Sequence, residues 1–125
     1  MNSKGFPEEV QVFKNRKEWR DWLAVHHQSE TLVWLLIQKV HSQKTGIRLA
    51  EAVEEALCYG WIDGQMYRLD DEQFVIRLTP RRRKSIWSKR NKTRAEELIA
   101  AGQMTEAGLA AIREAKASGR WQAAH

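Results

Sequence analysis

Basic residues gather in one short stretch of the 125-residue chain. Between positions 81 and 94 the sequence has eight lysines and arginines and no acidic residue. This segment carries +8 and the whole chain +5, so the rest of the chain carries −3. A mildly acidic domain with one basic segment is expected to attract a polyanion, such as nucleic acid, an acidic protein surface or an anionic membrane face. The alternative is a solvated helix start that only keeps the protein soluble.

The basic segment runs from a predicted strand that ends at Pro80 into a predicted helix. Free N–H groups in the first turn of a helix attract anions, and arginine adds bidentate contacts to phosphate. Asn91 or one of two serines can cap the helix, and Trp87 is expected to pack in the core. Nucleic acid is the favoured partner, ahead of an acidic protein or a small phosphate ligand. The predicted anion-binding residues are Arg81, Arg82, Arg83, Lys84, Ser85, Ser88, Lys89 and Arg90.

A second group of reactive residue types consists of Cys58, Trp61 and Asp63, set around two glycines. One hypothesis is a ligand pocket in which Asp63 acts as an acid or base and Trp61 stacks on a planar ligand. Another makes Cys58 a nucleophile, which requires a base such as His26 or His27 to lower its pKa. The favoured interpretation is structural: a small buried cysteine at a helix end, followed by a glycine-assisted turn into a strand.

No metal or cofactor is expected. The sequence contains neither CxxC nor HExxH, and neighbouring histidines on a helix point in different directions. It also lacks the glycine patterns GxxxxGKS/T and GxGxxG, which argues against nucleotide hydrolysis by a P-loop. The favoured function is therefore non-enzymatic binding, and the alternative is an enzyme or small-ligand receptor at the cysteine pocket. If Asp63 and the arginines 81–83 line one cleft, the two hypotheses merge into one anion-binding pocket.

Hydrophobic periodicity predicts the elements that position these residues. Four residues from Trp19 to His26 recur at i, i+3, i+4 and i+7, which predicts a helix over 16–27. Residues 10–13 are expected to form a short edge strand. Between positions 31 and 40 both alternating faces are apolar, which predicts a central strand covered on both sides.

A second helical stripe begins at Leu49 and is expected to end at Gly60, with Glu51, Glu54 and Glu55 on its solvent side.

Residues 61–69 and 73–79 are predicted to form a hairpin. Two further helices follow the basic segment, the last of them capped by Thr105 and ended by Gly119; Trp121 is expected to fold back onto the domain. The pattern predicts an α+β fold with an antiparallel or mixed sheet of three to four strands and about four helices.

Length and composition restrict the class of protein. A chain of 125 residues makes one domain, predicted to span 1–125 with a short flexible N-terminus at 1–8. Its longest apolar run has six residues, from 32 to 37, whereas a membrane-spanning helix needs about 20. The N-terminus lacks the apolar run of a secretory signal, and the single cysteine cannot form an internal disulfide. These features predict a cytoplasmic protein without a membrane span.

Several motifs carry a resemblance to a known family. The blocks ALCYGWIDG, TPRR and SIWSK occur in this order between positions 56 and 89. Over residues 15–124 the chain resembles the YdeI/OmpD-associated family, also called bacteriocin-protection proteins. The resemblance implies a link to tolerance of bacteriocins or cationic antimicrobial peptides, and it carries no established catalytic residue or cofactor. The residues in matching blocks are Cys58, Gly60, Trp61, Asp63, Gly64, Pro80, Arg81, Arg82, Ser85, Trp87, Ser88, Asn91, Met104, Gly108, Arg120 and Trp121.

Overall fold

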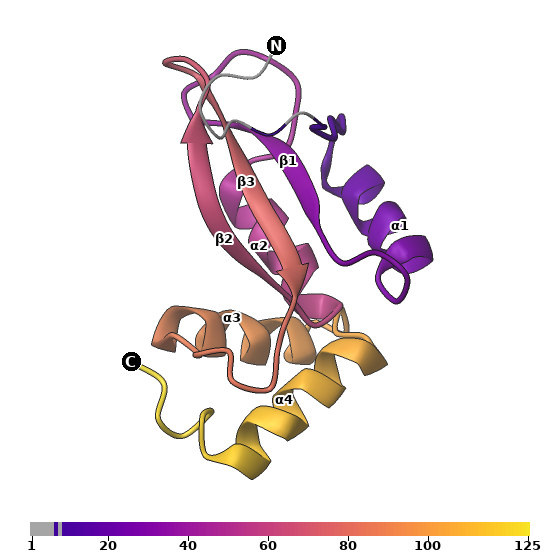
Figure 1. Cartoon of the computed structure of the whole chain (residues 1–125), viewed down its shortest axis with the longest axis vertical. Helices are drawn as coiled ribbons and strands as arrows, with labels where there is room; N and C mark the ends of the chain where they lie inside the picture. Colours follow the sequence, from indigo (N-terminus) through magenta and orange to yellow (C-terminus); the bar gives the residue numbers. More distant parts are fainter. Residues whose placement is uncertain (1–6, 8) are drawn as a thin grey trace.

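The computed structural model describes residue 7 and residues 9–125. The rest of the segment 1–8, which is predicted to be flexible, lies outside the described residues. The described residues form the predicted α+β fold of four helices and a three-stranded sheet (Figure 1). No helix of this described part has both the length and the apolar character that crossing a bilayer requires. The elements are α1 (Arg16–His26), β1 (Val33–Gln38), α2 (Leu49–Cys58), β2 (Trp61–Arg68), β3 (Gln73–Pro80), α3 (Lys89–Ala100) and α4 (Glu106–Ser118).

The sheet is antiparallel throughout and has the order β1-β3-β2. β2 and β3 form the predicted hairpin, and β1 pairs with the other side of β3. The prediction that residues 31–40 form a central strand covered on both sides was wrong, because the hairpin places β3 between its two neighbours. Of the edge strand predicted at 10–13, only Gln11 pairs, through a single parallel bridge to Leu35.

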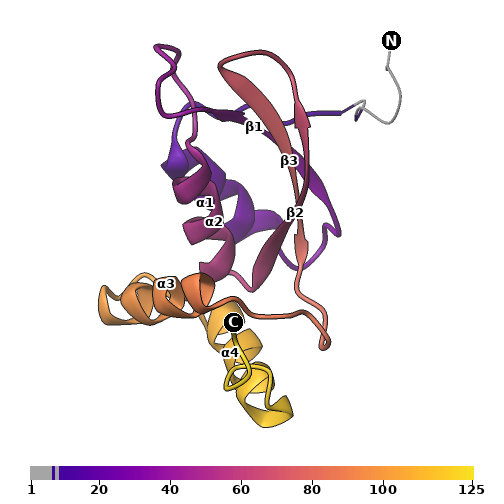
Figure 2. The same cartoon turned by 90° about the vertical axis from the view of Figure 1, so that its left-hand side faces the viewer.

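Helices α1 and α2 cover one face of the sheet, and no helix of the described residues lies on the other face (Figure 2). β1 alternates as predicted, so that Val33 and Leu35 point into the core. Trp34, however, lies on the uncovered face, where its ring centroid is 5.4 Å from that of Tyr67. The main core therefore lies between one face of the sheet and two helices. Its buried residues are Trp19, Leu23, Val33, Leu35, Ile37, Ile47, Ala52, Ala56, Trp61, Ile76 and Leu78.

A second, smaller core joins α2 to α3 and α4, which lie beyond one end of the sheet (Figure 1). α2 contributes to both cores because Ala52 and Ala56 face the sheet while Val53 and Leu57 face the C-terminal helices. The prediction that Trp121 folds back onto the domain is confirmed, since this residue is buried. The second core consists of Val53, Leu57, Trp87, Ala95, Ile112, Ala115 and Trp121.

The start of α4 packs directly against the end of α2. A Cβ at Gly108 would lie 2.5 Å from the carbonyl oxygen of Cys58 and 2.8 Å from that of Leu57, so only glycine permits this approach. Gly60 follows α2 with a φ of 76°, and a Cβ there would lie 3.0 Å from the carbonyl oxygen of Ala107. Two glycines thus fix how α4 approaches the α2–β2 turn.

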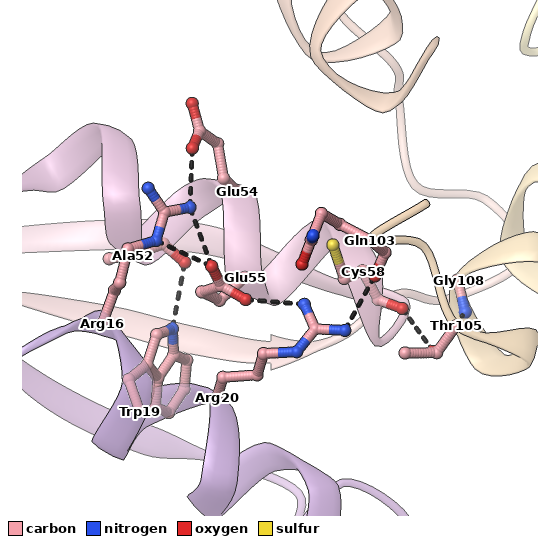
Figure 3. A network of polar contacts seen from close by, with 10 residues as sticks. All are labelled: Arg16, Trp19, Arg20, Ala52, Glu54, Glu55, Cys58, Gln103, Thr105 and Gly108. Atoms are coloured by element: carbon pink, nitrogen blue, oxygen red, sulfur yellow. Dashed lines mark hydrogen bonds and ion pairs between the residues drawn. The ribbon is translucent and has the colours of Figure 1, made fainter. Parts of the chain in front are cut away.

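An ion-pair cluster ties α1 to α2 (Figure 3). The carboxylate of Glu55 lies 2.7 Å from Arg16 and 2.8 Å from Arg20, and Arg20 also donates to the carbonyl oxygen of Gln103. The prediction that Glu55 lies on the solvent side of its helix was wrong, since this residue is only 6% exposed. The helical period predicts that Glu55 faces solvent. In the structure α1 packs over that side of α2 and brings two guanidinium groups to the Glu55 carboxylate.

Candidate anion-binding site

The basic segment connects the end of β3 to the start of α3 through a loop over residues 81–88. A turn shapes its middle, in which the backbone N–H of Arg82 donates to the hydroxyl of Ser85 at 2.9 Å. Ser88 is the N-cap of α3, and its hydroxyl accepts from the N–H of Asn91 at 3.0 Å. Because both hydroxyl groups hold backbone in place, these serines position the loop and the helix start.

Five cations of the segment are exposed, and four of them have no acidic partner among the described residues. These four are Arg82, Lys84, Lys89 and Arg90. Arg83 differs, because its Nε lies 3.2 Å from the carboxylate of Glu114 on α4. The four exposed cations, which we call the basic surface, are therefore available to an anion outside the protein.

Arg81 is the exception among the predicted anion-binding cations. Its guanidinium carbon lies 3.7 Å from the centroid of the Trp87 ring, which is buried as predicted. Its Nε and Nη2 atoms are shielded from solvent and find no hydrogen-bond partner among the described residues, while Nη1 donates to the carbonyl oxygen of Ile86 at 3.4 Å. Burial lowers the pKa of Arg81 to about 10, against the opposing effect of the Asp63 charge.

Arg81, Arg82 and Arg83 line one cavity of about 290 Å³. Its remaining wall comes from the α2–β2 turn, the loop and α4: Tyr59, Gly60, Ser85, Trp87, Ala107, Ala110, Ala111, Glu114 and Ala115. Three arginines and one glutamate give this cavity a formal charge of +2.

A second cavity, of about 420 Å³, shares Arg81, Arg82 and Ser85 with the first. It adds Arg77 and the end of β3. Arg81 therefore lines both cavities, and both are lined by positively charged side chains.

Cys58, Trp61 and Asp63 do not combine into a pocket with these arginines. Cys58 is fully buried, and burial raises the pKa of its thiol in spite of the Arg20 guanidinium beside it. Trp61 is buried in the main core. Asp63 pairs with Leu78 across the sheet and lines neither of the two cavities at Arg81.

The two candidate bases for Cys58 are engaged elsewhere. The His26 ring lies against Trp22, with centroids 4.9 Å apart. The His27 ring lies 5.0 Å from that of Tyr59, and its Nδ1 is 2.8 Å from the carbonyl oxygen of Leu23. The arrangement does not support nucleophilic catalysis by the cysteine. Within the part of the chain that the structure describes, no group of three or more His, Cys, Asp or Glu residues is placed to hold a metal ion.

The wall that α4 gives to the Arg81 cavity was not predicted from the sequence. Ala107, Ala110, Ala111 and Ala115 recur at helical spacing along α4. Alanine side chains do not by themselves indicate a ligand site, so only their spacing could have shown that they share one face of the helix. Tyr59 and Glu114 join the cavity only because α4 packs against the α2–β2 turn.

Residues 11–111 match the family described as a domain of unknown function, DUF8412. The matched region extends from the bridge at Gln11 into α4, and so it includes the basic segment. No curated protein and no solved structure has a significant match to the chain.

Proposed function

The chain belongs to the DUF8412 family, whose function is unknown, and we propose that it is a non-enzymatic binding protein whose basic segment engages an anionic partner. Nucleic acid is the partner that a row of cations favours, because its phosphates present negative charge at regular, short intervals. The family match gives no substrate or partner, so the proposal depends on the geometry and charge of the site.

The observation that carries the proposal is the basic surface. Arg82, Lys84, Lys89 and Arg90 are four exposed cations within nine consecutive positions, and no acidic side chain among the described residues neutralises them. Cations that only stabilise a fold are usually paired, as Arg16 and Arg20 are with Glu55. At physiological salt a charge acts over about 8 Å, so these four act together on a partner that lies across the loop and the helix start.

Three further features belong to the proposal. An enzyme or small-ligand receptor around Cys58, Trp61 and Asp63 is disfavoured, because these residues line neither cavity at Arg81. A cytoplasmic location agrees with the one free, buried cysteine. The resemblance to the YdeI/OmpD-associated family, with its link to bacteriocin tolerance, stays a prediction, since the family that matches is described without a function.

Fluorescence anisotropy with a labelled duplex that carries 5′-hydroxyl ends tests this function. If about four phosphates are contacted, log K falls against log salt with a slope of roughly −3.6. The variant Arg82→Gln/Lys84→Gln/Lys89→Gln/Arg90→Gln should bind far more weakly and keep its thermal midpoint, because exposed charges add little stability.

The matched control removes the same charge elsewhere. Lys14, Lys17, Lys44 and Arg68 are exposed and lie outside the basic segment. Replacing these four by Gln should reduce affinity much less than the first variant. Absence of binding at low salt, or an equal loss in both variants, would contradict a role for the basic surface in nucleic-acid binding.

A further inference from the structure

The unpaired atoms of Arg81 form one edge of its guanidinium group. Nε and Nη2 carry parallel N–H bonds, which is the edge that binds a carboxylate or phosphate through two hydrogen bonds. Neither atom has a partner among the described residues, and a shielded donor without a partner is costly. The remaining nitrogen contacts the backbone at Ile86 and the ring of Trp87 holds the group from one side. The anion-binding edge of this arginine is thus unpaired but shielded.

The charge of the surrounding cavity favours a dianion. Arg81, Arg82 and Arg83 contribute three positive charges, and Glu114 contributes one negative charge. A phosphate monoester carries about −1.5 to −2 at neutral pH, whereas a carboxylate or a phosphate diester carries −1. The formal +2 of the cavity is therefore matched by a monoester and only half matched by the other two.

The size and wall of the cavity restrict what is attached to that phosphate. A volume of about 290 Å³ lies at the lower end of small-ligand sites, which span roughly 300–1,000 Å³. Four alanines of α4 and the Tyr59 side chain form the wall away from the arginines. This space suits a phosphate joined to one sugar or ring and is too small for a dinucleotide.

We propose that the cavity at Arg81 is a binding site for one phosphate monoester, held by the Nε–Nη2 edge of Arg81 and by Arg82 and Ser85. This inference rests on the proposed function for its anionic partner and adds a second, more selective site beneath the basic surface. The ester comes either from the terminal nucleotide of a nucleic acid or from a small phosphorylated molecule. Arg81 lines both cavities, and binding of the ester requires its shielded edge to turn toward the ligand.

Asp63 supplies the competing explanation. Its charge acts on Arg81, so a movement that brought the carboxylate to the unpaired edge would leave no site. The two arrangements differ in wild-type binding and in their response to Asp63→Asn. If the edge binds a phosphate, the wild-type protein binds it and removing the nearby negative charge tightens binding. If Asp63 is the partner of Arg81, the wild-type protein binds no phosphate at this site and the same change lowers the thermal midpoint.

The experiment compares oligonucleotides of one sequence with a 5′-phosphate or a 5′-hydroxyl end, by fluorescence anisotropy, and ribose 5-phosphate with ribose, by thermal shift. We expect the phosphorylated end to bind about tenfold more tightly or better, as one bidentate contact provides. Binding of ribose 5-phosphate alone identifies a small molecule as a sufficient ligand. If ribose 5-phosphate has no effect while the end preference persists, the source is the terminal nucleotide.

Two variants assign the effect to Arg81. Arg81→Lys keeps the charge but removes the bidentate edge, so the preference for the 5′-phosphate should disappear while binding of the 5′-hydroxyl form is unchanged. Arg68→Lys, an exposed arginine at the end of β2, should retain the preference. A preference that survives in Arg81→Lys overturns the proposal.

The two proposals fail in different ways. Equal binding of the two oligonucleotides, with no shift by ribose 5-phosphate, overturns the phosphate site and leaves the basic surface intact. No binding of the 5′-hydroxyl form at low salt, with a clear shift by ribose 5-phosphate, removes the nucleic-acid function and supports the phosphate site.

Discussion

The guanidinium group of Arg81 lies over the ring of Trp87 with its carbon 3.7 Å from the ring centroid. This contact joins the first residue after β3 to the second core, in which Trp87 packs against Trp121 with ring centroids 5.0 Å apart. Arg81 is therefore an internal residue of the loop, and the exposed cations begin only at Arg82. A variant that replaces all three arginines 81–83 alters the packing of this loop as well as its charge.

Arg81→Met is expected to keep or raise the free energy of unfolding when no anion is bound. The stack on Trp87 contributes about 1–2 kcal/mol, but the two shielded N–H donors cost about 1–3 kcal/mol each. Methionine retains much of the packing and removes the donors. Urea denaturation followed by tryptophan fluorescence measures the change. A loss above about 2 kcal/mol would indicate that the guanidinium has a partner in the fold, with Asp63 as the first candidate.

Glu55→Gln should destabilise the protein by about 2 kcal/mol, because it leaves two partly exposed guanidinium groups facing a buried neutral side chain. Glu54→Gln is the matched control on the same helix. Its carboxylate also contacts Arg16 but is 31% exposed, so the cost should stay within about 1 kcal/mol. Chemical denaturation of both variants provides the comparison, and equal costs would show that the burial of Glu55 is unimportant.

Cys58 should react slowly with thiol reagents in the native protein at neutral pH. Burial raises the pKa of its thiol above the ordinary value of 9.0, so the reactive thiolate is scarce and shielded. The unfolded chain releases this proton first; the contribution of the thiol to stability is complete below pH 9.0 and is lost as pH rises through the folded-state pKa. Labelling kinetics at several pH values, with the denatured protein as control, test this, and fast native labelling would contradict it.

Trp19→Ala and Trp34→Ala should differ clearly in their cost. Trp19 is fully buried and its indole N–H donates to the carbonyl oxygen of Ala52 at 3.1 Å, so truncation should cost about 3–5 kcal/mol. Trp34 lies on the uncovered face of an edge strand, where it buries less area, and about half that cost is expected. Thermal denaturation compares the two, and equal losses would imply that another element covers this face.

Hydrophobic periodicity predicted the helices and the strands of the sheet, but the strand predicted at 10–13 is reduced to a single bridge at Gln11. The helices that begin after Asn15 and Thr105 start at these caps, and the hairpin between Trp61 and Pro80 forms as expected. Such signals depend on residues close in sequence, so they can be read without knowing the fold. The α+β class follows from the order of those elements.

The sequence by itself determined the helices, the strands of the sheet and the gathering of cations after Pro80, because each depends on neighbouring residues. Tertiary structure alone decided which strand is central, that Glu55 lies between two arginines, and that Arg81 turns inward while Arg82 stays in solvent. These outcomes depend on which elements pack together. The periodicity of a helix or strand shows which of its faces is apolar, but it does not show which distant element packs against that face. The cavity at Arg81 exists because α4 packs beside the α2–β2 turn, where Gly60 and Gly108 leave it room.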